Sequence, residues 1–175
     1  MMERLRLSAK KDVPKIVFDK FKERNQGYYD EKNVDVGAYD AFFTIKHPNG
    51  DVTYLAEQTG SYDTEGDTEE MTYFVDTRES EILGYGELRN NLTNRSEDYK
   101  DKPYVGYTRT EDAHARQGLG ARRLLEMNAV SEMKYGLPLH SGIIIEPRIT
   151  SLYEGLVKKG LVKKIFTGVE MFTFF

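Results

Sequence analysis

The sequence contains no cysteine and no tryptophan, and only five prolines and three histidines among its 175 residues. The absence of cysteine excludes disulfides, cysteine metal sites and a thiol nucleophile. No stretch approaches the roughly 18 consecutive apolar residues that a membrane-spanning helix needs. Residues 1–8 also lack the apolar run of a signal peptide. We therefore expect a cytoplasmic protein that does not act at a membrane.

An excess of positive charge is missing as well, because the formal net charge is −4. This balance argues against a nucleic-acid binder. The local exception is a group of four arginines, Arg109, Arg116, Arg122 and Arg123. These arginines either meet an anionic ligand such as a phosphate or lie solvated on a helix face.

The composition is that of one globular domain spanning residues 1–175, with 39% apolar and 31% charged residues. Hydrophobic spacing and turn signals predict strands and helices that alternate irregularly along the chain. The predicted strands are residues 5–7, 39–45, 52–57, 71–76, 81–88, 103–110, 139–145, 161–165 and 169–174. The predicted helices are residues 12–24, 118–135 and 149–157, and residues 60–70 and 90–102 are predicted as loops. This order predicts an α+β fold.

The junction between the strand at 103–110 and the helix at 118–135 is the most informative part of the chain. A short loop leads into Gly118-Leu119-Gly120, and the helix begins at once. Unpaired N–H groups at a helix start favour an anion, and glycine lets a phosphate come close to the backbone. The dinucleotide fingerprint would need glycine where Arg123 stands, and no Gly-Lys-Ser or Gly-Lys-Thr of a P-loop occurs.

The segment HARQGLGARRLL at residues 114–125 resembles the signature of the GNAT superfamily of N-acetyltransferases, Arg/Gln-x-x-Gly-x-Gly/Ala before a leucine-rich helix. Downstream, EPRITSLYEGL at residues 146–156 resembles the family segment Asn-Pro-Arg-Ala-x-x-Leu-Tyr-Glu-Lys-Leu. The resemblance covers residues 71–175 well and the N-terminal part loosely. Ala115 stands at the usual Arg/Gln position, and Glu146 replaces the usual asparagine.

The resemblance implies a mixed, mostly antiparallel sheet flanked by helices, in which strands 103–110 and 139–145 run parallel but splay apart. Acetyl-CoA, as co-substrate, would lie in that gap. Its pyrophosphate would meet backbone N–H groups of residues 117–121, and its pantetheine would pair with backbone around residues 108–110. The acetyl-CoA-binding residues so implied are Thr108, Arg109, Thr110, Arg116, Gln117, Gly118, Leu119, Gly120 and Ala121. A primary amine would attack the thioester directly in a ternary complex.

Three side chains are candidates for catalysis. By resemblance Tyr153 is the general acid that protonates the departing thiolate, since a phenol suits this task; the alternative is a core tyrosine. His140 and Glu87 are rival general bases for the attacking amine. The other two histidines, His47 and His114, have no partner at metal-ligand spacing, so we expect no metal site.

The sequence leaves the acetyl acceptor open between a small amine and a lysine or N-terminus of a protein. The hairpin at residues 39–57 is expected as an addition that shapes the acceptor side. A homodimer also stays open. The alternative function is a GNAT-fold binding or interaction module with little catalysis, motivated by Ala115 and Glu146. A different α+β fold with a fortuitous Gly-Leu-Gly turn is the third alternative.

Overall fold

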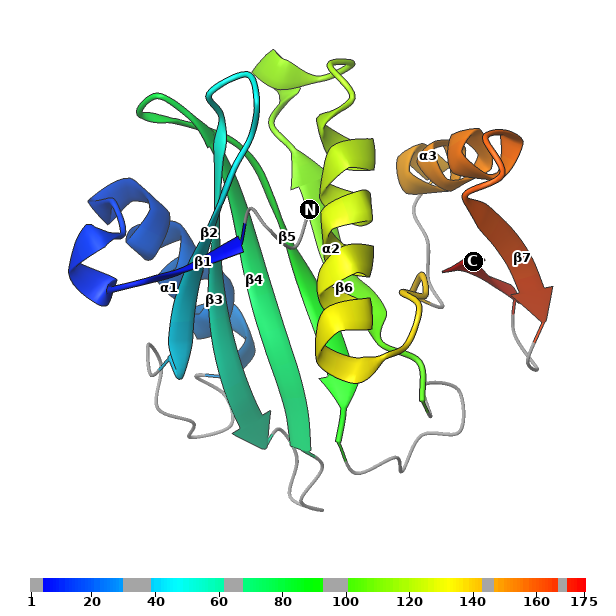
Figure 1. Cartoon of the computed structure of the whole chain (residues 1–175), viewed down its shortest axis with the longest axis horizontal. Coiled ribbons are helices and arrows are strands. Elements are labelled where there is room, and N and C mark those ends of the chain that lie inside the picture. Colours follow the sequence, from blue (N-terminus) through cyan, green and yellow to red (C-terminus); the bar gives the residue numbers. More distant parts are fainter. Residues whose placement is uncertain (1–4, 30–38, 62–67, 93–100, 143–146, 167–169) are drawn as a thin grey trace.

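The structure is a computed structural model that describes residues 5–29, 39–61, 68–92, 101–142, 147–166 and 170–175. In this part of the chain a six-stranded antiparallel sheet is flanked by helices on both faces, and a two-stranded sheet stands beside it (Figure 1). The strands are β1 (Leu5–Ser8), β2 (Ala41–Lys46), β3 (Val52–Ser61), β4 (Thr68–Arg78), β5 (Glu81–Asn91), β6 (Tyr104–Thr110), β7 (Val162–Phe166) and β8 (Glu170–Phe174). The α+β class is confirmed.

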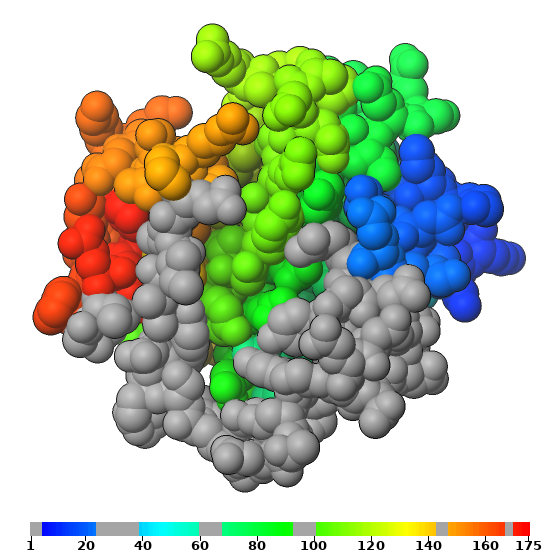
Figure 2. Space-filling view, turned by 180° about the vertical axis from the view of Figure 1, so that it is seen from behind, coloured from blue at the N-terminus to red at the C-terminus, as the bar shows by residue number. Residues whose placement is uncertain are grey.

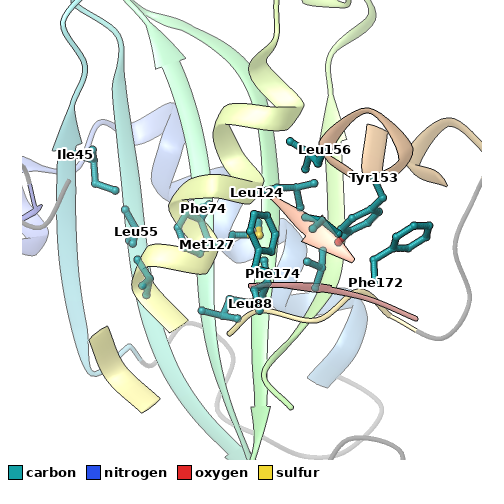
Figure 3. Close-up of a cluster of buried hydrophobic side chains, with 14 residues drawn as sticks. Ile45, Leu55, Phe74, Leu88, Leu124, Met127, Tyr153, Leu156, Phe172 and Phe174 are labelled. Carbon is teal, nitrogen blue, oxygen red and sulfur yellow. The ribbon is translucent and has the colours of Figure 1, made fainter. Parts of the chain in front are cut away.

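The helices divide between the two faces of the large sheet. They are α1 (Lys15–Tyr29), α2 (Leu119–Tyr135) and α3 (Pro147–Lys158), together with short 3-10 turns at Lys10–Asp12 and Asp112–His114. Helix α1 buries Val17 and Phe21 against an aromatic-rich face that includes Tyr73. On the opposite side α2 packs directly on the sheet, where its Leu124 and Met127 contact Phe74 and Leu88 (Figure 3). Helix α3 lies beside α2 and against β7, and this side is called the α2/α3 face (Figure 1).

The N-terminal helix differs from its prediction at both ends. Asp12, the first residue of the predicted helix, instead ends the short 3-10 turn, and α1 begins after Pro14, whose carbonyl accepts hydrogen bonds from Val17 and Phe18. Proline fits this place because the first N–H groups of a helix lack intrahelical acceptors anyway. The helix also runs past Gly27 to Tyr29. The predicted helix end at residue 24 was wrong, because a single glycine such as Gly27 costs a helix only about 1 kcal/mol.

The hairpin predicted at residues 39–57 is β2 and β3, and it lies inside the large sheet between β1 and β4. Gly50 provides the positive φ of 93° that its turn requires. Strand β3 then continues to Ser61, and β4 begins at Thr68, so the loop predicted at 60–70 is too long. Its central residues, 62–67, lie outside the described part. Strand β5 likewise extends to Asn91, beyond the predicted end at Leu88.

The C-terminal strands are joined to the large sheet through His140. It forms a parallel bridge to Tyr104 of β6 and an antiparallel bridge to Thr173 of β8. The Val105 N–H donates to the His140 carbonyl at 3.0 Å, and the His140 N–H donates to the Pro103 carbonyl at 2.8 Å. Parallel pairing of the two predicted strands is therefore present at this point. The rest of the strand predicted at 139–145 falls partly on residues 143–146, outside the described residues.

Candidate functional site

The loop and first helical turn at residues 116–121 present six consecutive backbone N–H groups. No hydrogen-bond acceptor for any of them lies within the described part of the chain, and the first helical bond runs from the Arg122 N–H to the Gly118 carbonyl at 3.0 Å. The N-cap residue is Gly118, and because glycine has no side chain it cannot donate or accept a capping hydrogen bond through one. Amide groups in this arrangement, added to the helix dipole, form a site for an anion.

The backbone of this loop is held open by two left-handed residues. Arg116 has a φ of 64° and Gly118 a φ of 76°. The loop is exposed, and a Cβ atom at Gly118 would meet no heavy atom within 4 Å. At Gly120 a Cβ atom would instead lie 3.1 Å from Leu152 of α3, so this glycine also lets α2 and α3 pack closely. Gly118 is therefore the glycine that faces solvent, and Gly120 has a packing role as well.

Strand β6 leads to this loop and has one edge open beyond Val105 in the described part of the chain. The Glu111 N–H donates to the Leu83 carbonyl of β5 at 2.9 Å. Because backbone groups alternate in direction along a strand, the N–H and C=O groups of Thr108 and Thr110 point to the other edge. From behind, β6 and the loop after it form a strip of surface between α1 and α3 (Figure 2). This edge is available to a ligand that pairs with backbone.

The group of four arginines predicted near the loop is not a single anion site. Arg123 is fully buried, and its Nε donates to Asp76 Oδ2 at 2.8 Å. Its Nη1 donates to the hydroxyl of Thr108 at 2.9 Å, so the Thr108 side chain faces α2 rather than a ligand. The buried guanidinium occupies the space above Gly84, where any side chain would collide with it. The solvated-arginine interpretation is equally wrong for Arg123.

Arg122 also has an internal partner, the buried carboxylate of Asp51 in the β2–β3 turn. Arg122 Nη1 donates to Asp51 Oδ2 at 2.9 Å, and Arg78 Nε donates to Asp51 Oδ1 at 2.9 Å. Hydrogen bonds from Arg78 and Arg122 hold the pKa of Asp51 well below its usual range despite its burial. Arg109 is exposed on β6, and Arg116 is exposed in the loop. Only Arg116 of the four stands among the open N–H groups.

Glu126 and His47 form a buried pair that the sequence did not indicate. Glu126 Oε1 lies 3.0 Å from His47 Nε2, and a pocket of about 420 Å³ lies between α2 and the β2–β3 turn beside them. Burial, reinforced by the charge of Asp76, raises the pKa of Glu126 to about 8. In the sequence Glu126 is one charged residue within the helix predicted at 118–135, and this does not reveal its partner.

Tyr153 lies in the core of the α2/α3 face. Its ring stacks on Phe172 of β8, with ring centroids 5.0 Å apart (Figure 3). The side chain is 1% exposed, and its hydroxyl has no hydrogen-bond partner among the described residues. Burial raises the pKa of this phenol, so the hydroxyl stays protonated at neutral pH. Burying a hydroxyl is costly unless it has a hydrogen-bond partner, which sets Tyr153 apart from the apolar residues around it.

His140 and Glu87 lie on the other face of the sheet, the face covered by α1. Glu87 is paired in register with Tyr73, which packs in the α1 cluster. His140 follows Leu139, which packs in the α2/α3 cluster, so its side chain points to the opposite side. No hydrogen bond or ion pair joins Tyr153, His140 and Glu87 to one another within the described residues.

The two candidate bases differ in their surroundings. Because a carbonyl can only accept, His140 Nδ1 carries the proton and donates to the Pro138 carbonyl at 2.9 Å. This leaves Nε2 of the neutral ring with its lone pair. Burial lowers the pKa of His140, which favours the neutral ring. Glu87 Oε2 instead accepts from Arg89 Nη2 at 2.8 Å, so one of its oxygens is occupied.

Two further properties of the described residues bear on the site. They contain no group of three or more His, Asp or Glu side chains able to hold a metal ion. No helix within the same residues is long and apolar enough to span a membrane.

Comparison with known proteins gives a weak structural likeness. Neither a protein-family model nor a characterised protein sequence matches the chain. A crystal structure from Bacillus anthracis str. Ames, of a provisionally named streptothricin acetyltransferase in complex with acetyl coenzyme A, is similar in structure. The two chains are 13% identical, the alignment covers 97% of this chain and 92% of that one, and the TM-score is 0.41. The functional assignment therefore depends on the residues of this chain.

Proposed function

We propose that this protein is a GNAT-type N-acetyltransferase that transfers the acetyl group of acetyl-CoA to a primary amine. The observation that carries the proposal is the run of six backbone N–H groups at residues 116–121 without acceptors in the described chain. A pyrophosphate supplies several acceptor oxygens and two negative charges. It therefore fits an amide-lined loop at a helix N-terminus better than a neutral ligand does.

The open edge of β6 supports the orientation of the cofactor. With the pyrophosphate at the start of α2, the pantetheine would run back along β6 and pair with the backbone of Thr108 and Thr110. The thioester would then lie toward Val105, where His140 joins β6. This direction brings the reacting carbon to the point where His140 bridges β6, which can be reached from the α1 face and from the α2/α3 face.

The chemical step divides between these two faces. An amine approaching from the α1 face would lose its proton to Nε2 of His140, directly or through water, while Glu87 stays the alternative base. The thiolate would leave toward the α2/α3 face, where the Tyr153 hydroxyl is protonated and has no described partner. The N–C bond forms as the C–S bond breaks, and one proton moves from the amine while another reaches the sulfur. No acyl-enzyme is needed, and the chain has no cysteine to form a thioester.

The proposal is tested first by binding and then by turnover. Isothermal titration calorimetry should detect acetyl-CoA binding, and no binding at high micromolar ligand would reject the assignment. Release of CoA thiol can then be followed with a thiol reagent over a panel of small amines, lysine peptides and free N-terminal peptides. Because the protein has no cysteine, it contributes no background to this assay. Binding without thiol release across the panel would favour the binding module.

A pH profile distinguishes the two bases. If His140 accepts the proton, kcat/KM falls on the acid side as the ring becomes protonated, with a midpoint below about 6.5. His140→Gln should remove that limb and most of the turnover. An unchanged limb in this variant would shift the role to Glu87.

A further inference from the structure

We infer that Asp51 and Arg78 are positioning residues for the pyrophosphate loop, an inference that rests on the proposed function. Arg78, at the end of β4, contacts two parts of the chain at once. Its Nε and Nη2 donate to the two oxygens of Asp51 at 2.9 and 3.1 Å, and its Nη1 donates to Gln117 Oε1 at 3.1 Å. Gln117 lies in the loop between the two left-handed residues.

The fixed end of this connection is Asp51. Its side chain is 1% exposed, and it also accepts from Arg122 Nη1 in the first turns of α2 and from Asn49 Nδ2 at 3.1 Å. The hydrogen bonds from Arg122 and Asn49 hold the Asp51 carboxylate in place, and the two from Arg78 orient the guanidinium on it. Removing one partner of such a group is costly, because a buried charge is left poorly compensated. The turn of the β2–β3 hairpin therefore serves as the anchor.

The loop needs an anchor of this kind. Its N–H groups form no hydrogen bonds within the described chain, and a left-handed conformation at a residue such as Arg116 costs roughly 1–2 kcal/mol. Nothing in the local backbone bonding thus selects this shape over others. The hydrogen bond from Arg78 to Gln117 is the one side-chain bond that ties residues 116–118 to another element in the described structure.

The hairpin consequently acts at the phosphate end of the site. Asp51 holds Arg78 and Arg122 together, and these three side chains carry a net charge of +1 beside the loop. Their effect on an anion is exerted through the loop and the helix start rather than by contact. The sequence predicts that this hairpin shapes the acetyl-acceptor side, and that prediction stays untested. The contacts of Asp51 give the β2–β3 turn a role at the phosphate end instead.

A double-mutant cycle on acetyl-CoA affinity tests the inference. Arg78→Gln removes the donor, and Gln117→Ala removes the acceptor without altering a backbone N–H group. Each should weaken the Kd about three- to tenfold, as expected for the loss of one solvent-exposed hydrogen bond. The double variant should be no weaker than the weaker single variant, because both changes break the same connection. Arg6→Gln on the distant strand β1 is the charge-matched control and should leave the Kd unchanged.

The alternative outcomes are distinct. Additive losses would make Arg78 an independent contact to the cofactor and overturn the positioning role. If Arg78→Gln fails to fold, Gln117→Ala alone decides, since Gln117 is exposed: an unchanged Kd in that variant overturns the inference. Wild-type protein that does not bind acetyl-CoA would instead reject the proposed function, and the inference with it.

Discussion

The two ends of helix α2 are built alike but are used differently. Each is bounded by a left-handed glycine, Gly118 with a φ of 76° and Gly136 with a φ of 65°. At the C-terminal end the Gly136 N–H donates to the Glu132 carbonyl at 2.9 Å. Two side chains of the helix complete that end, since the Ser131 hydroxyl donates to the Leu137 carbonyl and Asn128 Oδ1 accepts from the Leu139 N–H.

At the N-terminal end no side chain of the described chain satisfies the N–H groups of residues 116–121. Glycine provides the required turn at both ends, so the glycines themselves do not tell a binding site from a structural cap. The difference lies in whether the surrounding backbone groups have partners. An end that the chain completes itself stabilises the fold, and an exposed end that it leaves open can bind a ligand.

The largest expected effect comes from placing the same substitution at both ends. Gly118→Glu puts a carboxylate among the open N–H groups, and acetyl-CoA affinity should fall roughly 100-fold through repulsion of the pyrophosphate. Gly136→Glu carries the same charge and a similar backbone strain of about 1 kcal/mol, with no atom within 4 Å of its Cβ position. It should leave the affinity unchanged. Calorimetry measures both, and equal losses in the two variants would remove the distinction between the ends.

Tyr153 is a second group left without a described partner, and its role can be separated from its packing. Tyr153→Phe should lower turnover about 100-fold, the usual size of a general-acid contribution, while acetyl-CoA affinity stays the same. Because the hydroxyl has no hydrogen-bond partner among the described residues, the free energy of unfolding should stay constant or rise by at most about 1 kcal/mol. Wild-type turnover in this variant would make Tyr153 a core residue only.

Between the two ends, Glu126 makes the stability of the protein depend on pH. Its pKa is raised to about 8 in the fold, so the folded protein holds this proton and stability is lost as the pH rises from about 4.5 to about 8. Glu126→Gln keeps a neutral group and should be more stable than wild type by about 2 kcal/mol above pH 8, less than the full shift implies because the protein relaxes around a buried charge. The difference should vanish near pH 4.5. Urea unfolding across this range checks it, and parallel curves would contradict it.

The smallest effect is expected at the completed end of the helix. Asn128→Ala removes the acceptor of the buried Leu139 N–H, which should lower the free energy of unfolding by about 1–2 kcal/mol. Acetyl-CoA affinity should not change. Asn128→Asp keeps an acceptor oxygen and is the matched control, so its stability loss should be smaller. A change in affinity without a change in stability would show that this end also takes part in binding.

Local patterns in the sequence were enough for the elements that form the loop. Good helix formers without a breaker gave the helix that the structure places at Leu119–Tyr135, and the strand before it begins within one residue of its prediction. Gly118 was also recognisable, because a glycine between a strand and a helix has few other uses. These features depend on neighbours in the chain, which is why the sequence reveals them. Whether residues 108–110 and 116–121 bind acetyl-CoA, and whether Tyr153, His140 or Glu87 act in catalysis, stay predictions.

The sequence by itself thus determined the α+β class and the turn that opens α2, through periodicity and turn chemistry. Only the tertiary structure decided which charges meet. Arg123 is used inside the protein because Asp76 of β4 comes to lie under the helix. Asp51 of the β2–β3 turn pairs with Arg78, and Arg78 in turn contacts Gln117. The residues that bond directly in these pairs are 27 to 47 positions apart in the chain. Charge in a sequence does not reveal its partner, since burial and pairing are set by how distant elements pack.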